Sequence, residues 1–303
     1  MLGPVTVGNA LRRACEGLEV AGVEDARLNA ELLLAHTLGV PRLTLHARPE
    51  TPLAGQEHSL YCSLVARRAR REPLAYILQR WEFYGLEFIV TPAVLVPRPE
   101  TETLVEAAVR WLQARGHTSC APTNQATGAR PLLIADVGTG SGCTAVALAR
   151  QFPAVSVFAV DTSPEALEVA GRNARRHGVE RRVVFLQGHL VGPLPEPVDL
   201  MVANLPYISE TDFPGLQPEI RCYEPRGSLV AREGGLALNR ALLGTGASRL
   251  RSGGVLFLEF SPPQRERLER AARQCFPGAQ ITVLKDMGGL DRVLAVEPRS
   301  RES

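Results

Sequence analysis

Residues 132–149, with the sequence LLIADVGTGSGCTAVALA, decide the fold of this chain. An apolar run rich in branched side chains predicts a buried strand that ends in an acidic residue, Asp136. Three glycines follow at alternate positions, Gly138, Gly140 and Gly142, and the residues after them predict a helix. Glycines allow a tight turn that a ligand can approach closely, and the helix directs unpaired N–H groups into that turn. The stretch therefore predicts the first βα unit of a nucleotide-binding sheet, and the alternative is a tight turn that binds nothing.

The chain after this turn alternates between strand and helix patterns. Strands are expected at residues 132–136, 155–160, 182–187, 198–203, 254–260, 280–285 and 291–297, and helices at residues 143–151, 164–176, 235–250 and 263–275. This alternation predicts a mostly parallel sheet with right-handed crossovers. The last two strands are joined by residues 287–291 without a helix, so we expect them to be antiparallel neighbours. The predicted fold class is α/β, with a Rossmann-like sheet of seven strands.

The first 78 residues have helical patterns and no strand signal. Helices are expected at residues 7–19, 24–38 and 60–71. Residues 1–78 are therefore predicted to form a small N-terminal helical domain. Its third helix carries the densest basic cluster in the chain, made of Arg67, Arg68, Arg70 and Arg71. This cluster is either a solvated helix face or a contact for an RNA-bearing or acidic partner.

A linker and a second domain follow the helical region. Apolar and aromatic residues alternate around Gly85, which predicts a β-hairpin linker over residues 79–96. Residues 97–303 are predicted to form the second domain. A helix is expected from near Pro99 to about residue 113, because proline suits an early helical position.

Two local features belong to the start of this second domain. Thr103 and Glu106 have the spacing of a capping box at the beginning of the expected helix. Residues 113–130 are polar and without periodicity, so a loop is expected there.

Composition excludes several classes of protein. The formal net charge of +2 is too small to indicate a nucleic-acid or lipid partner. The six cysteines are scattered without a Cys-x-x-Cys pair, so no metal site and no disulfide framework is expected, and a reducing compartment is indicated. No apolar run reaches membrane-spanning length, and no signal peptide is evident. We therefore expect a cytoplasmic protein without a membrane partner.

An acidic residue at the end of the second strand narrows the choice of cofactor. Asp161 is placed to accept hydrogen bonds from the ribose hydroxyls of a bound nucleotide. NAD enzymes share this feature, but their turn usually reads G-x-G-x-x-G. The closely spaced glycines after Asp136 and the helix-less final strand pair favour S-adenosyl-L-methionine, which has no pyrophosphate to bind.

The segment Asn204-Leu205-Pro206-Tyr207 follows the fourth strand, whose carboxyl end faces the cofactor crevice of such a sheet. The nitrogen of an amide or of an adenine amino group is a poor nucleophile because its lone pair is delocalised. Two acceptors can hold and polarise its N–H groups, and the Asn204 side-chain oxygen and the Leu205 carbonyl could supply them. Pro206 would fix the turn, and Tyr207 would offer a ring face to a planar group. A turn without a catalytic role is the alternative.

Over nearly its whole length the chain resembles the HemK/PrmC family of protein N5-glutamine methyltransferases. The resemblance rests on Asp25–His36, Glu72–Leu78 with Trp81-Glu82-Phe83, Pro97–Glu102, Asp136–Gly142, Asp161 and Asn204–Tyr207. It implies an N-terminal helical domain that recognises the substrate, a hairpin linker and a class I methyltransferase domain over residues 97–303. It also implies methyl transfer to the glutamine of the Gly-Gly-Gln motif in peptide chain release factors, which would be the protein partners.

The sequence departs from the family pattern in the site itself. Leu205 replaces the first proline of the usual Asn-Pro-Pro-Tyr, although a backbone carbonyl survives this change. His189, before Leu190, stands where the family usually has an aspartate that would accept a hydrogen bond from the adenine amino group. His189 can accept only through a neutral ring nitrogen, so weaker or pH-sensitive cofactor binding is expected. In the segment that starts at Leu258, with the sequence LEFSPPQ, the usual glycine after the acidic residue is absent.

The sequence thus predicts a methyltransferase that uses S-adenosyl-L-methionine. The predicted catalytic residues are Asn204, Leu205, Pro206 and Tyr207, and the predicted cofactor-binding residues are Asp136, Gly138, Thr139, Gly140, Ser141, Gly142, Asp161, His189, Leu190 and Asn204. Three rival functions stay open: glutamine methylation of a ribosomal protein, adenine-N6 methylation of a nucleic acid, and cofactor binding without catalysis. The Asn-Leu-Pro-Tyr form also occurs in rRNA adenine dimethyltransferases, but a low aromatic content argues against a nucleic-acid substrate.

Overall fold

The computed structural model describes residues 5–117 and 131–299. The chain forms two compact units, which we call the helical unit and the sheet unit. The helical unit is Met1–Arg80 together with Gln217–Tyr223, and the sheet unit is Trp81–Leu216 together with Glu224–Ser303. Within the described ranges, no helix is long and apolar enough to cross a membrane.

The helical unit contains more helices than the sequence predicts. Its helices are α1 (Val7–Val20), α2 (Ala26–Leu38), α3 (Arg42–Ala47), α4 (Gly55–Ala69), α5 (Leu74–Leu78) and α9 (Pro218–Tyr223). The first two agree closely with the prediction. The third predicted helix corresponds to α4, which begins five residues before the predicted start at residue 60. The helices α3, α5 and α9 were not predicted, because they are shorter than two turns and carry no readable period.

The core of the helical unit is apolar and closed by a buried tyrosine. Leu18, Leu33 and Leu34 are fully buried, and Tyr61 packs among them. The Tyr61 hydroxyl donates to the Ala30 carbonyl at 3.1 Å, which joins α4 to α2. This bond satisfies the polar end of a side chain that otherwise contributes apolar area.

The arginine cluster at the C-terminal end of α4 is largely paired within the helical unit. Arg67 forms two hydrogen bonds with Glu72. Arg68 and Arg71 both bind Glu219 of α9, and the Arg71 guanidinium does so with two nitrogens at 2.6 and 2.7 Å. Three of the four charges are therefore balanced inside the unit, so the interpretation as a solvated face was wrong for them, and Arg70 is exposed.

The sheet unit begins with the predicted hairpin, β1 (Arg80–Phe83) and β2 (Leu86–Ile89). Asn173, a buried residue of α8, binds both backbone groups of Ile89, at 2.7 and 2.9 Å. Its amide also donates to the Ser141 carbonyl at 2.8 Å. One side chain thus attaches the hairpin and the glycine turn to the same helix.

A seven-stranded sheet forms the centre of this unit, as predicted. Its strands are β3 (Leu132–Val137), β4 (Val155–Asp161), β5 (Val183–Gln187), β6 (Val198–Ala203), β7 (Leu250–Glu259), β8 (Gln280–Lys285) and β9 (Asp291–Glu297). The spatial order is β5-β4-β3-β6-β7-β9-β8. Strands β3 to β7 are parallel, and β9 is antiparallel to both β7 and β8. The prediction of an antiparallel final pair is confirmed.

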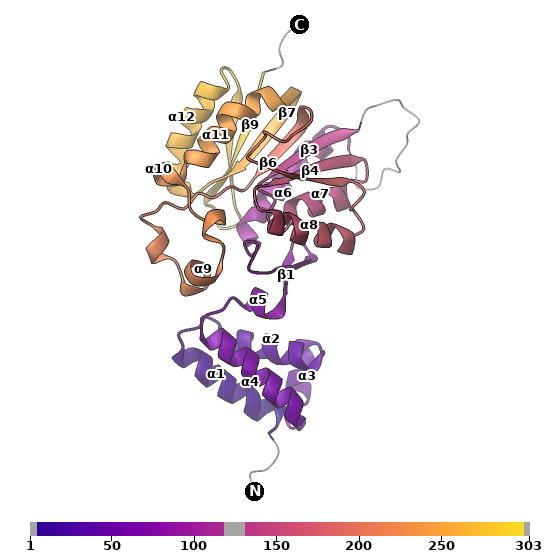
Figure 1. Ribbon diagram of the computed structural model, residues 1–303, viewed down its shortest axis with the longest axis vertical. Coiled ribbons are helices and arrows are strands. Elements are labelled where there is room, and N and C mark those ends of the chain that lie inside the picture. The colour runs from indigo at the N-terminus through magenta and orange to yellow at the C-terminus, as the bar shows by residue number, and fades with distance from the viewer. Residues whose placement is uncertain (1–4, 118–130, 300–303) are drawn as a thin grey trace. The chain divides into compact units, whose positions relative to one another are not determined.

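Helices cover both faces of the sheet (Figure 1). One face carries α6 (Glu102–Ala114), α7 (Cys143–Gln151) and α8 (Pro164–Arg176), and the other carries α10 (Arg232–Gly235), α11 (Ala237–Gly246) and α12 (Arg265–Cys275). Short 3-10 turns are η1 (Pro99–Thr101), η3 (Phe213–Gly215), η4 (Arg226–Ser228), η5 (Ala247–Arg249) and η6 (Pro262–Gln264). Each face buries its own apolar core, as expected for a parallel sheet.

Three local predictions in this unit need comment. The helix predicted at residues 235–250 ends at Gly246, because the chain turns through η5 and enters β7 at Leu250. The predicted capping box was wrong: α6 begins at Glu102, which places Thr103 inside the helix, and Glu106 pairs with Arg110 instead. Most of the loop predicted at residues 113–130 lies outside the described residues.

Candidate active site

The glycine turn joins β3 to α7 in a conformation that suits glycine. Gly138, Gly140 and Gly142 all have positive φ angles, of 78°, 54° and 78°. The N–H groups of Gly138 and Thr139 both donate to the Val160 carbonyl, at 2.8 and 2.9 Å, so the turn is attached to β4. Gly142 is also sterically required, because a Cβ there would lie 2.9 Å from the Cβ of Ala170.

Asp136, at the end of β3, stabilises this turn through hydrogen bonds. Its buried carboxylate accepts hydrogen bonds from the Thr139 hydroxyl at 2.6 Å and from the Ala145 N–H at 3.1 Å. Burial raises the pKa of Asp136 to about 6, even though these two bonds favour its charged form. The side chain thus links the turn to the first residues of α7.

Asp161 ends β4 beside the turn, where the sequence placed it. Its two carboxylate oxygens accept from the backbone N–H groups of Gly140 and Ser163, at 2.9 and 3.0 Å. Each carboxylate oxygen can accept a further hydrogen bond, so a vicinal diol could still bind here. These contacts fix the carboxylate at the carboxyl edge of the sheet.

The Asn204–Tyr207 segment follows β6 at the same edge. Asn204 is partly exposed, and its amide donates to the Thr101 hydroxyl oxygen at 2.9 Å. Leu205 is buried against the glycine turn, since a Cβ on Gly138 would lie 2.9 Å from its Cδ2 atom. The hydroxyl of Tyr207 donates to Glu259 Oε1 at 3.2 Å.

A cavity of about 380 Å³ lies where these segments meet. Of the predicted residues, Gly138, Gly140, Asp161, His189, Leu190, Asn204, Leu205 and Pro206 line it. An adjoining hollow of about 50 Å³ is lined by Asp136, Thr139, Ser141 and again by Gly138, Gly140 and Asn204. Gly142 and Tyr207 line neither space: the first packs on α8 and the second is held behind the wall by Glu259.

Other lining residues of the larger cavity were not predicted from the sequence. They are Ala93, Leu95, Val137, Val160, Thr162, Ser163, Gly188, Pro225, Gly227, Ser228 and Leu238. Leu95 and Leu238 supply apolar walls, and the residues after Asp161 supply polar ones. Thr162 and Ser163 could have been found, because they continue directly from a recognised strand end. The lining residues before residue 100 and after residue 220 come from segments distant in sequence.

The cavity has the composition of a small-molecule site. Its wall combines apolar side chains with a carboxylate at Asp161 and amide and carbonyl groups at Asn204 and Leu205. A Cβ atom built on Gly140 would meet no other atom within 4 Å, so the space next to this glycine is open. His189, the predicted departure from the family pattern, is exposed at the edge of this wall.

Two residues hold Tyr207 behind the cavity wall. Glu259, at the end of β7, is fully buried and accepts the tyrosine hydroxyl. Gln264 of η6 donates from its amide to the Tyr207 carbonyl at 2.8 Å. Burial raises the pKa of Glu259 to about 7, and burial likewise raises the pKa of Tyr207. Tyr207 is therefore a neutral donor at physiological pH.

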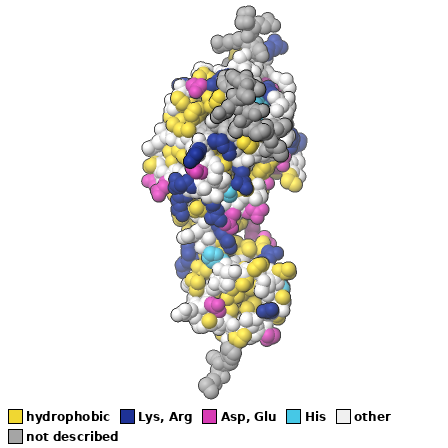
Figure 2. Space-filling model, turned by 90° about the vertical axis from the view of Figure 1, so that its right-hand side faces the viewer, with side chains coloured by type: hydrophobic (Ala, Val, Ile, Leu, Met, Phe, Trp, Pro, Cys, Tyr) yellow, Lys and Arg dark blue, Asp and Glu magenta, His cyan; other side chains and the backbone are white. Residues whose placement is uncertain are grey.

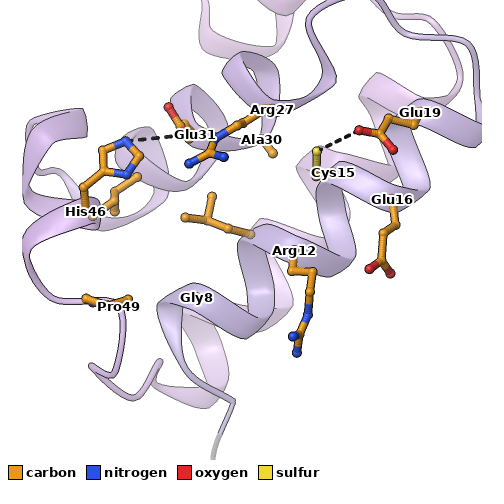
Figure 3. Close-up of a pocket in the computed structure, with 12 residues that line it drawn as sticks. Gly8, Arg12, Cys15, Glu16, Glu19, Arg27, Ala30, Glu31, His46 and Pro49 are labelled. Atoms are coloured by element: carbon orange, nitrogen blue, oxygen red, sulfur yellow. Dashed lines mark hydrogen bonds and ion pairs between the residues drawn. The ribbon is translucent and has the colours of Figure 1, made fainter.

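A second hollow lies within the helical unit (Figure 3). Its wall is formed by α1, α2 and the segment that includes α3, with Leu11, Ala30 and Leu45 as apolar members. Glu31 is buried there and pairs with Arg27 at 3.0 Å and with His46 at 3.4 Å. Within the described part of the chain, no group of three or more His, Cys, Asp or Glu side chains could hold a metal ion.

The surface charge of the chain is mixed. Figure 2 shows basic side chains on one face with acidic side chains among them. Arg226–Glu210 and Arg240–Glu233 are ion pairs between exposed side chains. Mixed charge of this kind differs from the continuous basic surface that nucleic-acid binding requires.

Fold and site together define a class I methyltransferase. The family model described as a methyltransferase domain matches residues 134–227. Among solved structures, the hMettl16 catalytic domain in complex with the MAT2A 3′UTR hairpin 6 matches with a TM-score of 0.56 and 16% identity, over 79% of this chain and 84% of that one. At this identity the likeness concerns the fold alone, and the RNA belongs to that protein.

Sequence comparison identifies the family within this class. The model of the PrmC N-terminal domain matches residues 9–78. Proteins named release factor glutamine methyltransferase are similar over most of their length: that of Geobacter sulfurreducens is 42% identical over 90% of both chains, and that of Moorella thermoacetica is 40% identical over 95% of this chain and 97% of its own. The chain belongs to the release factor glutamine methyltransferase family. The predicted family is confirmed, and the named relatives favour none of the three rival functions.

Proposed function

We propose that this protein transfers a methyl group from S-adenosyl-L-methionine to the side-chain N5 nitrogen of the glutamine in the Gly-Gly-Gln motif of peptide chain release factors. The observation that carries the proposal is the position of Asn204. It lies at the carboxyl end of β6, in the wall of the cavity that the glycine turn and Asp161 also line. Membership of the family supports the choice of glutamine and of release factors.

The residues present fit the proposed cofactor. Asp161 is placed for the ribose hydroxyls, Gly138 and Gly140 offer backbone without a Cβ in the way, and Leu190 with Leu238 offers apolar walls. When bound, S-adenosylmethionine supplies an electrophilic methyl group on a positively charged sulfur. His189 would lie at the adenine end, where it replaces an acidic acceptor.

The substrate amide would be held by two acceptors. The Oδ1 atom of Asn204 and the carbonyl of Leu205 would accept its two N–H groups, which localises the nitrogen lone pair toward the methyl donor. A new N–C bond forms as the S–C bond breaks, and one amide proton then leaves to water. Positioning supplies most of the rate, because the only ionisable group of the Asn204–Tyr207 segment is the partly buried, neutral Tyr207.

The helical unit is proposed to bind the body of the release factor. Its hollow between α1, α2 and α3 has an apolar wall and a rim in which Arg12 and Glu16 point away from Glu31 (Figure 3). A protein surface with both apolar and charged groups could bind there. We further propose that the protein works in the cytoplasm, and that residues 1–78, 79–96 and 97–303 act as recognition domain, linker and catalytic domain.

A labelling experiment tests the proposal. The protein is incubated with methyl-labelled S-adenosylmethionine and a purified release factor, or with the same factor carrying Gly-Gly-Ala in place of Gly-Gly-Gln. We expect label in the first factor and none in the second. Equal labelling of both factors, or of neither, would contradict the proposal. Free glutamine serves as the second comparison and should be a poor substrate.

A further inference from the structure

The proposed role of Asn204 requires its amide to point one way. Only the Oδ1 atom can accept a substrate N–H, whereas the Nδ2 atom can only donate. In the structure Nδ2 donates to the Thr101 hydroxyl oxygen at 2.9 Å, which leaves Oδ1 for another partner. A flipped amide would present two donors to a substrate that also donates. Something must therefore fix the direction of this bond.

The Thr101 hydroxyl does not fix the direction by itself. A hydroxyl has one proton and two lone pairs, so it can accept from Nδ2 or donate to Oδ1. Thr101 is buried, with 4% of its surface exposed, so bulk water does not offer it another partner. The direction depends on where the Thr101 proton goes.

Glu259 has an unoccupied acceptor atom at the same edge of the sheet. Strands β6 and β7 are parallel neighbours with Ala203 paired to Leu258, so the residues that follow, Asn204 and Glu259, lie at the same edge of the sheet. Glu259 Oε1 accepts the Tyr207 hydroxyl, and Oε2 is buried without a hydrogen-bond partner among the described residues. Burial raises the pKa of this carboxyl, and an interaction with the Thr101 hydroxyl lowers it.

We propose that Thr101 and Glu259 are positioning residues that fix the direction of the Asn204 amide. The ionised carboxylate of Glu259 attracts the Thr101 proton, the Thr101 oxygen must then accept from Asn204 Nδ2, and Oδ1 faces the substrate. The inference rests on the proposed function, because it assigns Asn204 Oδ1 to a substrate amide. It gives a task to two buried residues that do not line the larger cavity.

The same carboxylate holds the other end of the segment. The Tyr207 hydroxyl donates to Glu259, and the Tyr207 carbonyl is held by Gln264. A Cβ on Gly235 would overlap that carbonyl, so the backbone there is closely packed. In the proposal, Glu259 therefore positions both ends of the segment: it binds Tyr207 directly and acts on Asn204 through Thr101. The Leu205 carbonyl lies between these two residues in the chain.

Protonation of Glu259 should remove its control over the direction of the Asn204 amide. Burial raises its pKa to about 7, while Thr101, Tyr207 and Arg292 lower it and Glu100 raises it. Below that pH the carboxyl becomes a donor itself and no longer attracts the Thr101 proton. The Asn204 amide then loses its preferred direction. Methyl transfer should consequently rise with pH from about 6 to about 8.

Two substitutions of Thr101 separate positioning from packing. Thr101→Val keeps the shape and removes the hydroxyl, so kcat should fall about 10- to 100-fold while the Kd for S-adenosylmethionine stays unchanged. Thr101→Ser keeps the hydroxyl and should restore most of the rate. Thr245→Val, on an exposed hydroxyl that donates to the Ala241 carbonyl, is the matched control and should leave transfer unchanged. A folded Thr101→Val enzyme with wild-type kcat, or a Thr101→Ser enzyme as slow as Thr101→Val, would overturn the proposal.

The Glu259→Gln variant supplies a second, independent test. Its side chain is neutral at every pH, so the rise in kcat around pH 7 should disappear and the rate should stay low. The proposal is overturned if the variant keeps the wild-type pH profile. This measurement also decides the question if Thr101→Val does not fold.

An NMR measurement separates this inference from the proposed function. The Nδ2 protons of Asn204 should exchange with solvent more slowly in the wild type than in Thr101→Val, and their protection should fall as the pH drops below about 7. If the wild type labels no release factor, the proposed function fails, and the exchange data still test the positioning pair. Equal exchange in wild type and Thr101→Val would then overturn it.

Discussion

A Cβ atom on Gly138 would lie 2.9 Å from the Cδ2 atom of Leu205 and 3.4 Å from the Asn204 carbonyl oxygen. The glycine turn and the Asn204–Tyr207 segment therefore touch without room for a methyl group. Gly138 also has a φ of 78°, which disfavours any other residue. The cofactor turn and the proposed substrate-binding segment consequently fix each other's position.

We expect Gly138→Ala to lose cofactor binding for both reasons. The strained φ and the contact with Leu205 together should displace the turn and weaken S-adenosylmethionine binding by about tenfold or more. Isothermal titration calorimetry measures this directly. Gly253→Ala is the matched control, because Gly253 has a similar φ of 75° but open space around it. If both variants lose affinity equally, the contact with Leu205 has no role.

Asn204→Ala should abolish methyl transfer and leave cofactor affinity nearly intact. The substitution removes the Oδ1 acceptor, and loss of one such preorganised group costs about 10² to 10³ in kcat. The side chain donates to Thr101, so the variant also leaves that hydroxyl without its present partner. Single-turnover labelling measures the rate, and calorimetry measures binding.

Asn204→Asp is the sharper comparison at this position. It keeps the shape and an acceptor oxygen but cannot donate to Thr101 and brings a charge near Glu259. Its transfer rate should also be low. Wild-type rates in either Asn204 variant would remove the acceptor mechanism.

His189→Asp should tighten cofactor binding. A carboxylate at this exposed position of the cavity edge would accept from the adenine amino group at every pH above its own titration. An exposed hydrogen bond of this kind corresponds to about a 2- to 10-fold gain in affinity. His189→Asn carries an acceptor without the charge and should lie between the two. An unchanged Kd in His189→Asp would show that adenine does not reach this side chain.

Glu219 should be essential to the stability of the helical unit. Burial alone would raise the pKa of Glu219, but the hydrogen bonds from Arg71 and Arg68 hold this pKa below its usual value. Glu219→Gln leaves the buried Arg68 guanidinium without its anion and should lower the free energy of unfolding by about 1–3 kcal/mol. Because the folded pKa is depressed, this stabilisation is present above pH 4.5 and is lost as the pH falls through the folded value.

The control for this prediction is an exposed ion pair. Glu210→Gln removes the partner of Arg226, and both side chains are more than half exposed. Its effect on unfolding should be about 0–1 kcal/mol. Denaturant unfolding of the two variants at neutral pH compares them. Equal effects would mean that Arg68 is not held by Glu219 in solution.

The sheet could be predicted from sequence because its elements are long and buried. The bounds of α7, α8, β6, β8 and β9 agree with the predicted ranges to the residue, since apolar runs and glycine or proline punctuation mark them. The elements that were missed are short, as α3 and α5 are, or end without a stop signal, as α11 does before β7. Periodicity needs several turns before it becomes visible.

The residues of the candidate site also fall into those that the sequence could predict and those that it could not. Asp161 and Asn204 could be placed together because the carboxyl ends of parallel strands share one edge of the sheet. Thr101 and Gln264 could not, because their contacts span 103 and 57 residues of sequence and depend on how α6 and η6 pack. Glu259 did carry a signal, since it is an acid at the carboxyl end of a predicted strand, as Asp161 is. Its burial is what the sequence did not show.

The burial of Glu259 leads to a last prediction, on stability. Its pKa is raised by burial from 4.5 to about 7, so the folded state binds a proton more tightly than the unfolded chain does. Stability contributed by the protonated form is therefore complete below pH 4.5 and is lost as the pH rises to about 7. Glu259→Gln removes this dependence, so its melting temperature relative to the wild type should be higher at pH 8 than at pH 5. Asp136 has a raised pKa of about 6 as well, and it is unchanged in both proteins, so its contribution cancels in the comparison. Differential scanning calorimetry at the two pH values measures the difference. If the melting temperatures of Glu259→Gln and the wild type differ by the same amount at pH 5 and at pH 8, Glu259 is already ionised, or already solvated, across this range.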